Sequence, residues 1–303
     1  MRARPKAFLI LFVVALIWGL ASVVIKATLD GIEPVSFLVY RFGISSLLAL
    51  FSYKKIFALR KKPLETKGMV LLYSLISTPV ALGLLFVGMT QSSVLTLAVF
   101  TAMGPIILSV AGHIFFHEHL THTQKIGAAI AFVGSLVSIA PEFFHHEGVG
   151  TLFGSILIFL YILVDAASVL VLKKLLRAGI DGTTLTHLSF ISGFVCLLPF
   201  LLLTNKGFFT SLPTLPASIH LGVFYMAVLS GTVAFALRAK AQKTIGLSEA
   251  GFMGYLVPIL STLFAVLFLS EAITKEFAIG AIIITVGVFL IEYHKPHKKP
   301  TRS

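Results

Sequence analysis

The chain has 303 residues, of which 57% are hydrophobic and only 12% are charged, and its formal net charge is +12. A soluble domain carries about 25% charged residues, so the composition excludes an ordinary water-soluble protein. Long apolar runs recur along the whole chain. They lack the alternation of apolar and polar residues that marks the strands of a membrane barrel. The sequence therefore predicts an all-α integral membrane protein.

Ten apolar segments come close to the roughly 20 residues that one membrane-spanning helix needs. Short joins with turn or charge signals separate many of them, for example Asp30-Gly31 and Asp181-Gly182. We expect a cytoplasmic N-terminus at 1–6 and a basic cytoplasmic tail at 294–303. The predicted spans are 7–29, 34–53, 68–88, 93–115, 122–140, 149–172, 183–203, 216–237, 247–269 and 274–293.

One pattern of four residues occurs twice, 153 positions apart. Its copies are Pro105, Glu118, Gly127, Gly134 and Pro258, Glu271, Gly280, Gly287. Repeats inside apolar sequence are typical of transporters, whose site lies between the halves. We assign the halves to 7–140 and 149–293. Each holds five spans, an odd number, so the second half must enter the membrane upside down. The sequence thus predicts two inverted five-helix repeats.

The basic residues indicate the orientation, because Lys and Arg accumulate on the cytoplasmic side. With the N-terminus inside, every Lys and Arg falls inside except Lys26, Arg41, Lys206 and Lys275. This bias predicts that both termini are cytoplasmic. It also explains the positive charge as a topology signal scattered over many loops, so no nucleic-acid partner is expected.

Arg41 and Asp165 are charged residues within predicted spans, where a charge must face a cavity or a partner. Arg41 suits an anion clamp for a substrate carboxylate or phosphate. Asp165 suits a cationic substrate group or a proton. Lys26 is expected to reach the nearby interface. The alternatives are ion pairs, of Arg41 with Asp30 or Glu33 and of Asp165 with Lys173, Lys174 or Arg238.

Aromatic and hydroxyl side chains could line a central cavity beside these charges. Trp18 lies in mid-span, away from the interface where Trp residues usually anchor. Each of these residues could instead be ordinary core packing, and the hydroxyls could bond helix carbonyls. With Arg41 and Asp165, the candidate substrate-binding residues are Trp18, Ser22, Tyr73, Ser77, Tyr161 and Tyr255.

The repeated residues have structural interpretations. Pro105 and Pro258 are expected to kink their spans and serve as hinges around the cavity, or to be simple packing bends. Glu118 and Glu271 end their spans and suit caps on the N-terminus of the next helix. The repeated glycines suit close helix packing, within the chain or between two copies, which leaves a homodimer open.

A metal site is not expected. His113 and His117 are spaced for zinc, but Thr121 breaks the zinc-protease signature that begins at His117. The single cysteine, Cys196, permits no internal disulfide and is expected in the core.

Three features resemble the drug/metabolite transporter superfamily, specifically its EamA-type ten-helix members. They are the Trp18-Gly19 helix followed by Lys26, the segment from Pro34 to Arg41-Phe42, and the doubled pattern of Pro, Glu, Gly and Gly. The likeness covers both halves. Tyr161 departs from it, since a Trp often stands there in the family, and so does the His-rich stretch at 113–122. The resemblance implies a carrier of small metabolites, often an exporter.

We therefore expect a secondary transporter that exports small organic metabolites, such as amino acids or drug-like compounds, by alternating access. It would lie in the plasma (bacterial inner) membrane, with the lipid bilayer and a small-molecule substrate as partners. It is expected to be no enzyme and to need no cofactor. A metal-dependent membrane enzyme and a passive channel are the alternatives. The sequence does not identify the substrate, the coupling ion or the oligomeric state.

Overall fold

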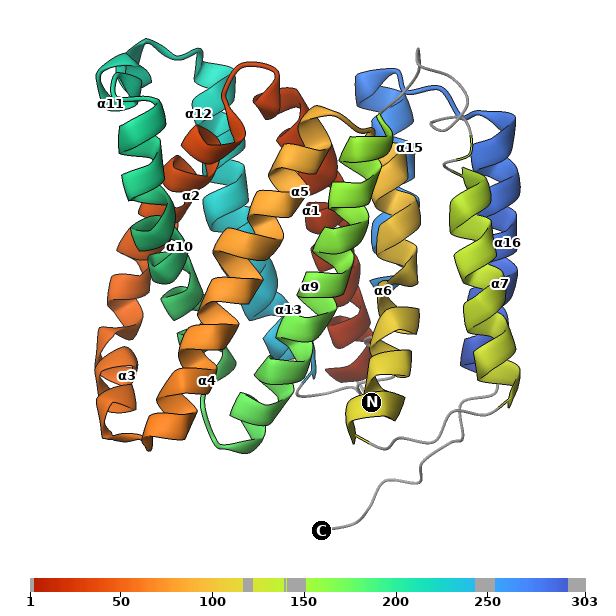
Figure 1. Ribbon diagram of the computed structural model, residues 1–303, viewed down its shortest axis with the longest axis horizontal. Coiled ribbons are helices and arrows are strands. Elements are labelled where there is room, and N and C mark those ends of the chain that lie inside the picture. The colour runs from red at the N-terminus through yellow and green to blue at the C-terminus, as the bar shows by residue number, and fades with distance from the viewer. Residues whose placement is uncertain (1–2, 117–121, 139, 141–150, 243–253, 294–303) are drawn as a thin grey trace.

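The computed structural model describes residues 3–116, 122–138, 140, 151–242 and 254–293 (Figure 1). All regular elements in these ranges are helical. Most helices run side by side between two opposite ends of the molecule. Glu118, one of the residues singled out in the sequence, lies outside the described residues.

The first half consists of helices with short joins. A π-helical turn, η3 (Ile76–Val80), connects α4 to α5, and two 3-10 turns flank α3, at Leu50–Ser52 and Leu59–Lys61. The α-helices are α1 (Ala3–Leu29), α2 (Pro34–Ala49), α3 (Tyr53–Ala58), α4 (Leu64–Leu75), α5 (Ala81–Thr90), α6 (Val94–Phe116) and α7 (His122–Ser138).

The second half has the same kind of organisation. A longer π-helical segment, η5 (Tyr225–Val233), connects α12 to α13, and a 3-10 turn at Leu212–Thr214 follows α11. The α-helices are α9 (Leu152–Arg177), α10 (Gly182–Thr204), α11 (Phe208–Ser211), α12 (Ala217–Phe224), α13 (Ala234–Gln242), α15 (Leu256–Leu269) and α16 (Lys275–Tyr293).

Several of these helical stretches are long and apolar enough to cross a membrane. Five satisfy both conditions: Pro5–Leu29, Pro34–Lys61, Leu64–Thr90, Leu152–Arg177 and Gly182–Thr204. A sixth arises if Phe208–Thr214 and Ala217–Val233, which meet at 109°, form one span. Many large apolar side chains also face outward, such as Phe115 and Phe289, where lipid would cover them. The protein is a multi-pass helical membrane protein, and the count of ten spans stays a prediction.

Two pairs of corresponding helices in the two halves begin at positions separated by the repeat distance. Pro63 and Pro216, 153 positions apart, both precede a helix in the same extended conformation. The same distance separates the first residues of α7 and α16. Each half also has a π-helical segment at the corresponding place: η3 lies between α4 and α5, and η5 lies between α12 and α13. The internal similarity therefore extends well beyond the four repeated residues.

Helix contacts also occur in matching pairs. Helix α1 packs against α15 and α13 of the second half. Its counterpart α9 packs against α6 and α5, which are the counterparts of α15 and α13 in the first half. Three further contacts join corresponding helices directly, namely α2 with α10, α6 with α15 and α7 with α16. In Figure 1, α7 begins at the lower end, whereas α16 begins at the upper end and runs the other way.

Repeated glycines form the contact between α7 and α16. A Cβ on Gly134 would lie 2.8 Å from the backbone nitrogen of Ile284 and 2.9 Å from the carbonyl oxygen of Gly280. A Cβ on Gly287 would lie 2.5 Å from the carbonyl oxygen of Gly127. The two backbones touch, which only small residues permit. The small faces found in the sequence therefore meet each other within one chain.

One expectation about local structure was wrong. Cys196 is exposed on α10 instead of buried in the core, because its side of the helix faces outward. Helix α9 continues to Arg177, past the predicted span end at 172, with charged residues in its last turn.

The α7–α16 contact can be tested with alanine. We expect Gly280→Ala to lower the apparent melting temperature in detergent by several degrees, since its Cβ would overlap Ser138 and lie 2.5 Å from the Gly134 oxygen. Overpacking of this kind costs about 1–3 kcal/mol. Gly83→Ala is the matched control, because a Cβ there meets nothing within 4 Å. Equal melting temperatures for the two variants would refute the contact.

Candidate functional site

Trp18 connects α1 to the η5–α13 region of the second half. Its indole Nε1 donates a hydrogen bond to the carbonyl oxygen of Ser230 at 3.2 Å. The ring of Phe235 meets it edge-on, with centroids 5.2 Å apart. The guanidinium of Arg238 lies 5.3 Å from the indole centroid, within the range of a cation–π interaction. The only tryptophan of the chain therefore places a cation against an aromatic face.

Arg41 is a buried cation that forms no ion pair with any residue that the structure describes. It lies in α2, and only 5% of its surface is exposed. Its Nε and Nη1 atoms are buried and have no hydrogen-bond partner. The rings of Phe42 and Phe86 lie 5.9 Å from the guanidinium, which offsets part of the cost of burial. The alternative ion pairs of Arg41 with Asp30 or Glu33 do not form in the structure.

Tyr161 and Asp165 are one turn apart on α9, so they lie on the same side of the helix. Tyr161 lies in the electrostatic field of both Arg41 and Asp165. Asp165 in turn interacts with Arg238, although no ion pair within 4.0 Å joins them in the described part of the chain. Arg41, Tyr161, Asp165 and Arg238 thus form a row of two cations, a phenol and a carboxyl group that runs from α2 through α9 to α13.

Tyr73 extends this group toward α4 and α10. Its phenol is buried and lies beside Ser77 and Thr186, within the field of Asp165. Ser77 also lies 3.4 Å from the hydroxyl of Thr78. Both residues belong to the π-helical turn η3, and such turns are frequent at functional sites. Six of the candidate residues, on five segments of the chain, therefore form one polar group: Trp18, Arg41, Tyr73, Ser77, Tyr161 and Asp165.

The remaining candidates have other surroundings. The Ser22 hydroxyl lies 3.1 Å from that of Ser261 on α15, so it takes part in the α1–α15 contact. Tyr255 lies in the turn before α15, and Pro258 in the first turn of that helix. Residues 243–253 lie outside the described part of the chain, so the expected kink at Pro258 stays a prediction. Pro105 lies inside α6.

Sequence reasoning did not include Arg238, Ser230 or Thr186 in the site. Arg238 was counted as a cytoplasmic charge and weighed as a partner of Asp165. It is exposed, yet its guanidinium packs on Trp18. The available signal was its position directly after the apolar run at 216–237, but that signal alone does not say which side chain Arg238 meets.

Exposure increases along the charged group. Arg41 is buried, Tyr161 and Asp165 are partly exposed, and Arg238 is exposed. Because Asp165 is the fourteenth residue of the 26-residue helix α9, its exposure does not come from a helix end. The charged group is therefore least buried where it approaches α13.

At the end of the bundle away from Arg238, the turn between α5 and α6 (Gln91–Ser93) is held in place by side chains from other helices. The ammonium of Lys26 donates to the carbonyl oxygens of Met89 at 2.8 Å and Ser92 at 2.7 Å. The last carbonyls of a helix have no partner within the helix, and a cation satisfies them well. Lys26 was expected at the lipid interface, so that prediction was wrong.

Glu271 holds the other side of the same turn. Its carboxylate accepts hydrogen bonds from the backbone N–H groups of Val94 at 2.9 Å and Leu95 at 3.0 Å. These are the first residues of α6, whereas the sequence suggested a cap on the following helix. Thr274 takes that place instead, by accepting from the N–H of Phe277. Glu271 therefore links the second half to the first.

Helix α9 also contacts this turn. The N–H of Thr151 donates to the carbonyl oxygen of Gln91 at 2.6 Å. A Cβ on Gly154 would lie 2.6 Å from the same oxygen, so the glycine permits this close approach. The α5–α6 turn is thus bound by α1, by α9 and by the α15–α16 link.

In the described part of the chain, no group of three His, Cys, Asp or Glu residues could hold a metal ion. His117, which the metal alternative needs, lies outside the described residues.

Comparisons with known proteins agree with this architecture. The model of the EamA-like transporter family matches residues 5–140 and 152–293. An uncharacterized transporter of Archaeoglobus fulgidus is 28% identical, over 95% of this chain and 97% of its own length. The uncharacterized transporter YoaV of Bacillus subtilis is 26% identical, over 94% and 96%. A crystal structure with 15% identity has a TM-score of 0.60 and covers 95% of this chain and 96% of its own, which shows a shared fold.

The Glu271 cap makes a specific prediction for hydrogen exchange. We expect Glu271→Ala to speed exchange of the Val94 and Leu95 amides about tenfold, because losing an N-cap costs roughly 1–2 kcal/mol. Glu276→Ala is the matched control, since Glu276 is exposed in the first turn of α16. Unchanged exchange in the Glu271 variant would show that the cap does not stabilise this turn.

Proposed function

Because the chain belongs to the EamA-like transporter family, we propose that it is a secondary transporter that exports small organic metabolites by alternating access. The observation that carries this proposal is the buried Arg41, whose Nε and Nη1 have no partner. An unpaired charge inside a membrane protein is costly and usually marks a substrate pathway. The substrate would supply the missing counter-charge.

The chemistry of the group favours a small molecule with an acidic and a basic end. A guanidinium binds a carboxylate or phosphate through paired hydrogen bonds, so Arg41 would hold the acidic end. Asp165 would hold an amino group or a proton. The indole of Trp18 and the phenols of Tyr73 and Tyr161 would pack on the part between. Amino-acid-like metabolites fit this arrangement, and drug-like compounds with the same groups would compete.

Alternating access would come from two inverted five-helix repeats with ten spans. This arrangement is supported by the repeat distance between the starts of α4 and α12 and of α7 and α16, by the matched contacts, and by the opposite directions of α7 and α16. Inverted halves can exchange conformations, which moves the opening of the site from one side to the other. Pro105 and Pro258 would act as hinges in α6 and α15.

The structure would then represent one state of the cycle. The bound α5–α6 turn would close one end, and exposed Arg238 would face the open end. Basic residues crowd the open end, for example Lys54, Lys55 and Arg60, which supports a cytoplasmic location for it. Both termini would be cytoplasmic, in a plasma or bacterial inner membrane. The transporter would act without a cofactor and would catalyse no covalent reaction.

Two substitutions test the site. We expect Arg41→Gln and Asp165→Asn each to reduce uptake of labelled amino acids and organic acids into proteoliposomes about 30-fold or more. Removing one partner of a desolvated charge pair costs at least about 2 kcal/mol. Lys206→Gln, an exposed charge in the α10–α11 loop, should keep wild-type uptake. Wild-type uptake in both site variants, with normal folding and insertion, would remove these residues from the site.

A further inference from the structure

A basic and aromatic segment at 50–67 lies at the end of the bundle opposite the α5–α6 turn (Figure 1). It carries six basic residues and one acidic residue, Glu65. Three of its aromatic side chains project from the protein, with exposed fractions of 89% for Phe51, 60% for Tyr53 and 59% for Phe57. Short helices with basic and aromatic side chains are typical of the membrane interface. The basic residues are Lys54, Lys55, Arg60, Lys61, Lys62 and Lys67.

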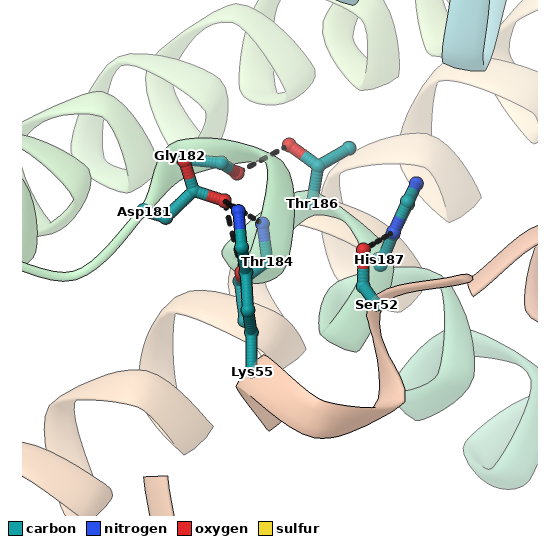
Figure 2. Close-up of polar contacts among 7 residues, drawn as sticks. All are labelled: Ser52, Lys55, Asp181, Gly182, Thr184, Thr186 and His187. Carbon is teal, nitrogen blue, oxygen red and sulfur yellow. Dashed lines mark hydrogen bonds and ion pairs between the residues drawn. The ribbon is translucent and has the colours of Figure 1, made fainter. Parts of the chain in front are cut away.

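Two polar contacts hold this segment against α10 (Figure 2). The Lys55 ammonium lies 3.4 Å from Asp181, whose carboxylate also accepts from the hydroxyl and backbone N–H of Thr184. One turn further along α10, His187 Nδ1 lies 2.7 Å from the hydroxyl of Ser52. Partial burial alone would raise the pKa of Asp181, but these hydrogen bonds and Lys55 lower that pKa below its ordinary value. The carboxylate therefore stays ionised near neutral pH.

Between the tethered segment and α10 lies an apolar hollow of about 240 Å³. Its walls include Leu50, Tyr53, Ile56 and Phe57, with Ile191 of α10 on the opposite side and Arg60 at its edge. The Arg60 guanidinium lies 4.5 Å from the centroid of the Phe57 ring. An open apolar hollow is thus combined with a cation that lies over one of its walls.

We propose that this hollow binds the acyl chain of an anionic phospholipid, with the phosphate of its headgroup on Arg60. The charge of the segment favours an anion, because the only ion pair that it makes in the described part of the chain is Lys55–Asp181. A basic cluster beside a membrane span attracts anionic lipids. The hollow is smaller than the roughly 300–1,000 Å³ of pockets for drug-sized ligands, so it suits part of a chain rather than a transported molecule.

The position of the hollow suggests a role for the lipid. The same helix, α10, carries Thr186, which lies beside Tyr73 of the candidate substrate site, and His187, which holds the segment. A lipid seated between α3 and α10 would therefore stabilise the contact of this segment with the bundle.

The test compares binding of phosphatidylglycerol and phosphatidylcholine with identical acyl chains to purified protein in detergent, by native mass spectrometry. We expect phosphatidylglycerol to bind wild type at least about fivefold more tightly. Arg60→Gln should weaken phosphatidylglycerol binding about fivefold, the usual contribution of one basic residue near an anionic surface. Lys125→Gln removes an equally exposed charge at the same end, on α7, and should leave binding unchanged.

A second variant tests the apolar part. Ile191→Phe fills the hollow and should weaken binding of both lipids while keeping the melting temperature of the lipid-free protein. Equal affinity of wild type for the two lipids would overturn the proposal, as would equal losses in the Arg60 and Lys125 variants. Full competition by soluble glycerol phosphate would also overturn it, since that result would indicate a site for free phosphate. None of these outcomes depends on whether the protein transports a metabolite.

Discussion

Inside the apolar layer of a membrane, a charge or backbone polar group is stable only when another group of the protein, or water, satisfies it. Most of this chain obeys that constraint through helices, and helix ends are satisfied by side chains from distant segments. Lys26 and Glu271 bond the two sides of the α5–α6 turn. Arg41 is the charged exception in the described part of the chain, with two buried nitrogen atoms unpaired. The proposed site follows from this exception, because a substrate with an acidic group would remove its cost.

The same contacts explain how the molecule could change shape. Where α7 and α16 meet, glycines bring the two backbones into direct contact, so this pair has little freedom to rearrange. The α5–α6 turn is held by hydrogen bonds from charged side chains, and residues beside it, such as Met89 and Val94, are buried in the core. In the proposed cycle, opening of that end would require α1, α9 and the α15–α16 link to release this turn.

Much of the fold could be predicted from the sequence, because apolar runs and repeat spacing depend only on residue type. Family membership was also correctly inferred, from the Trp18-Gly19 helix and the doubled pattern. The partners of polar side chains were harder to predict. Lys26 and Glu271 each lie near a helix end, but their acceptors and donors belong to helices that are distant in the chain. Arg238 was assigned to the cytoplasmic charges, since nothing in the sequence shows that its guanidinium packs on Trp18.

The antiparallel arrangement of the two halves is the central claim, and thiol labelling tests it directly. In a Cys196→Ser background, single cysteines would replace His122 and Lys275, which are exposed, 153 positions apart and the first residues of α7 and α16. A membrane-impermeant reagent should label position 122 only from the cytoplasmic side and position 275 only from the opposite side. Labelling of both positions from the same side would contradict inverted repeats.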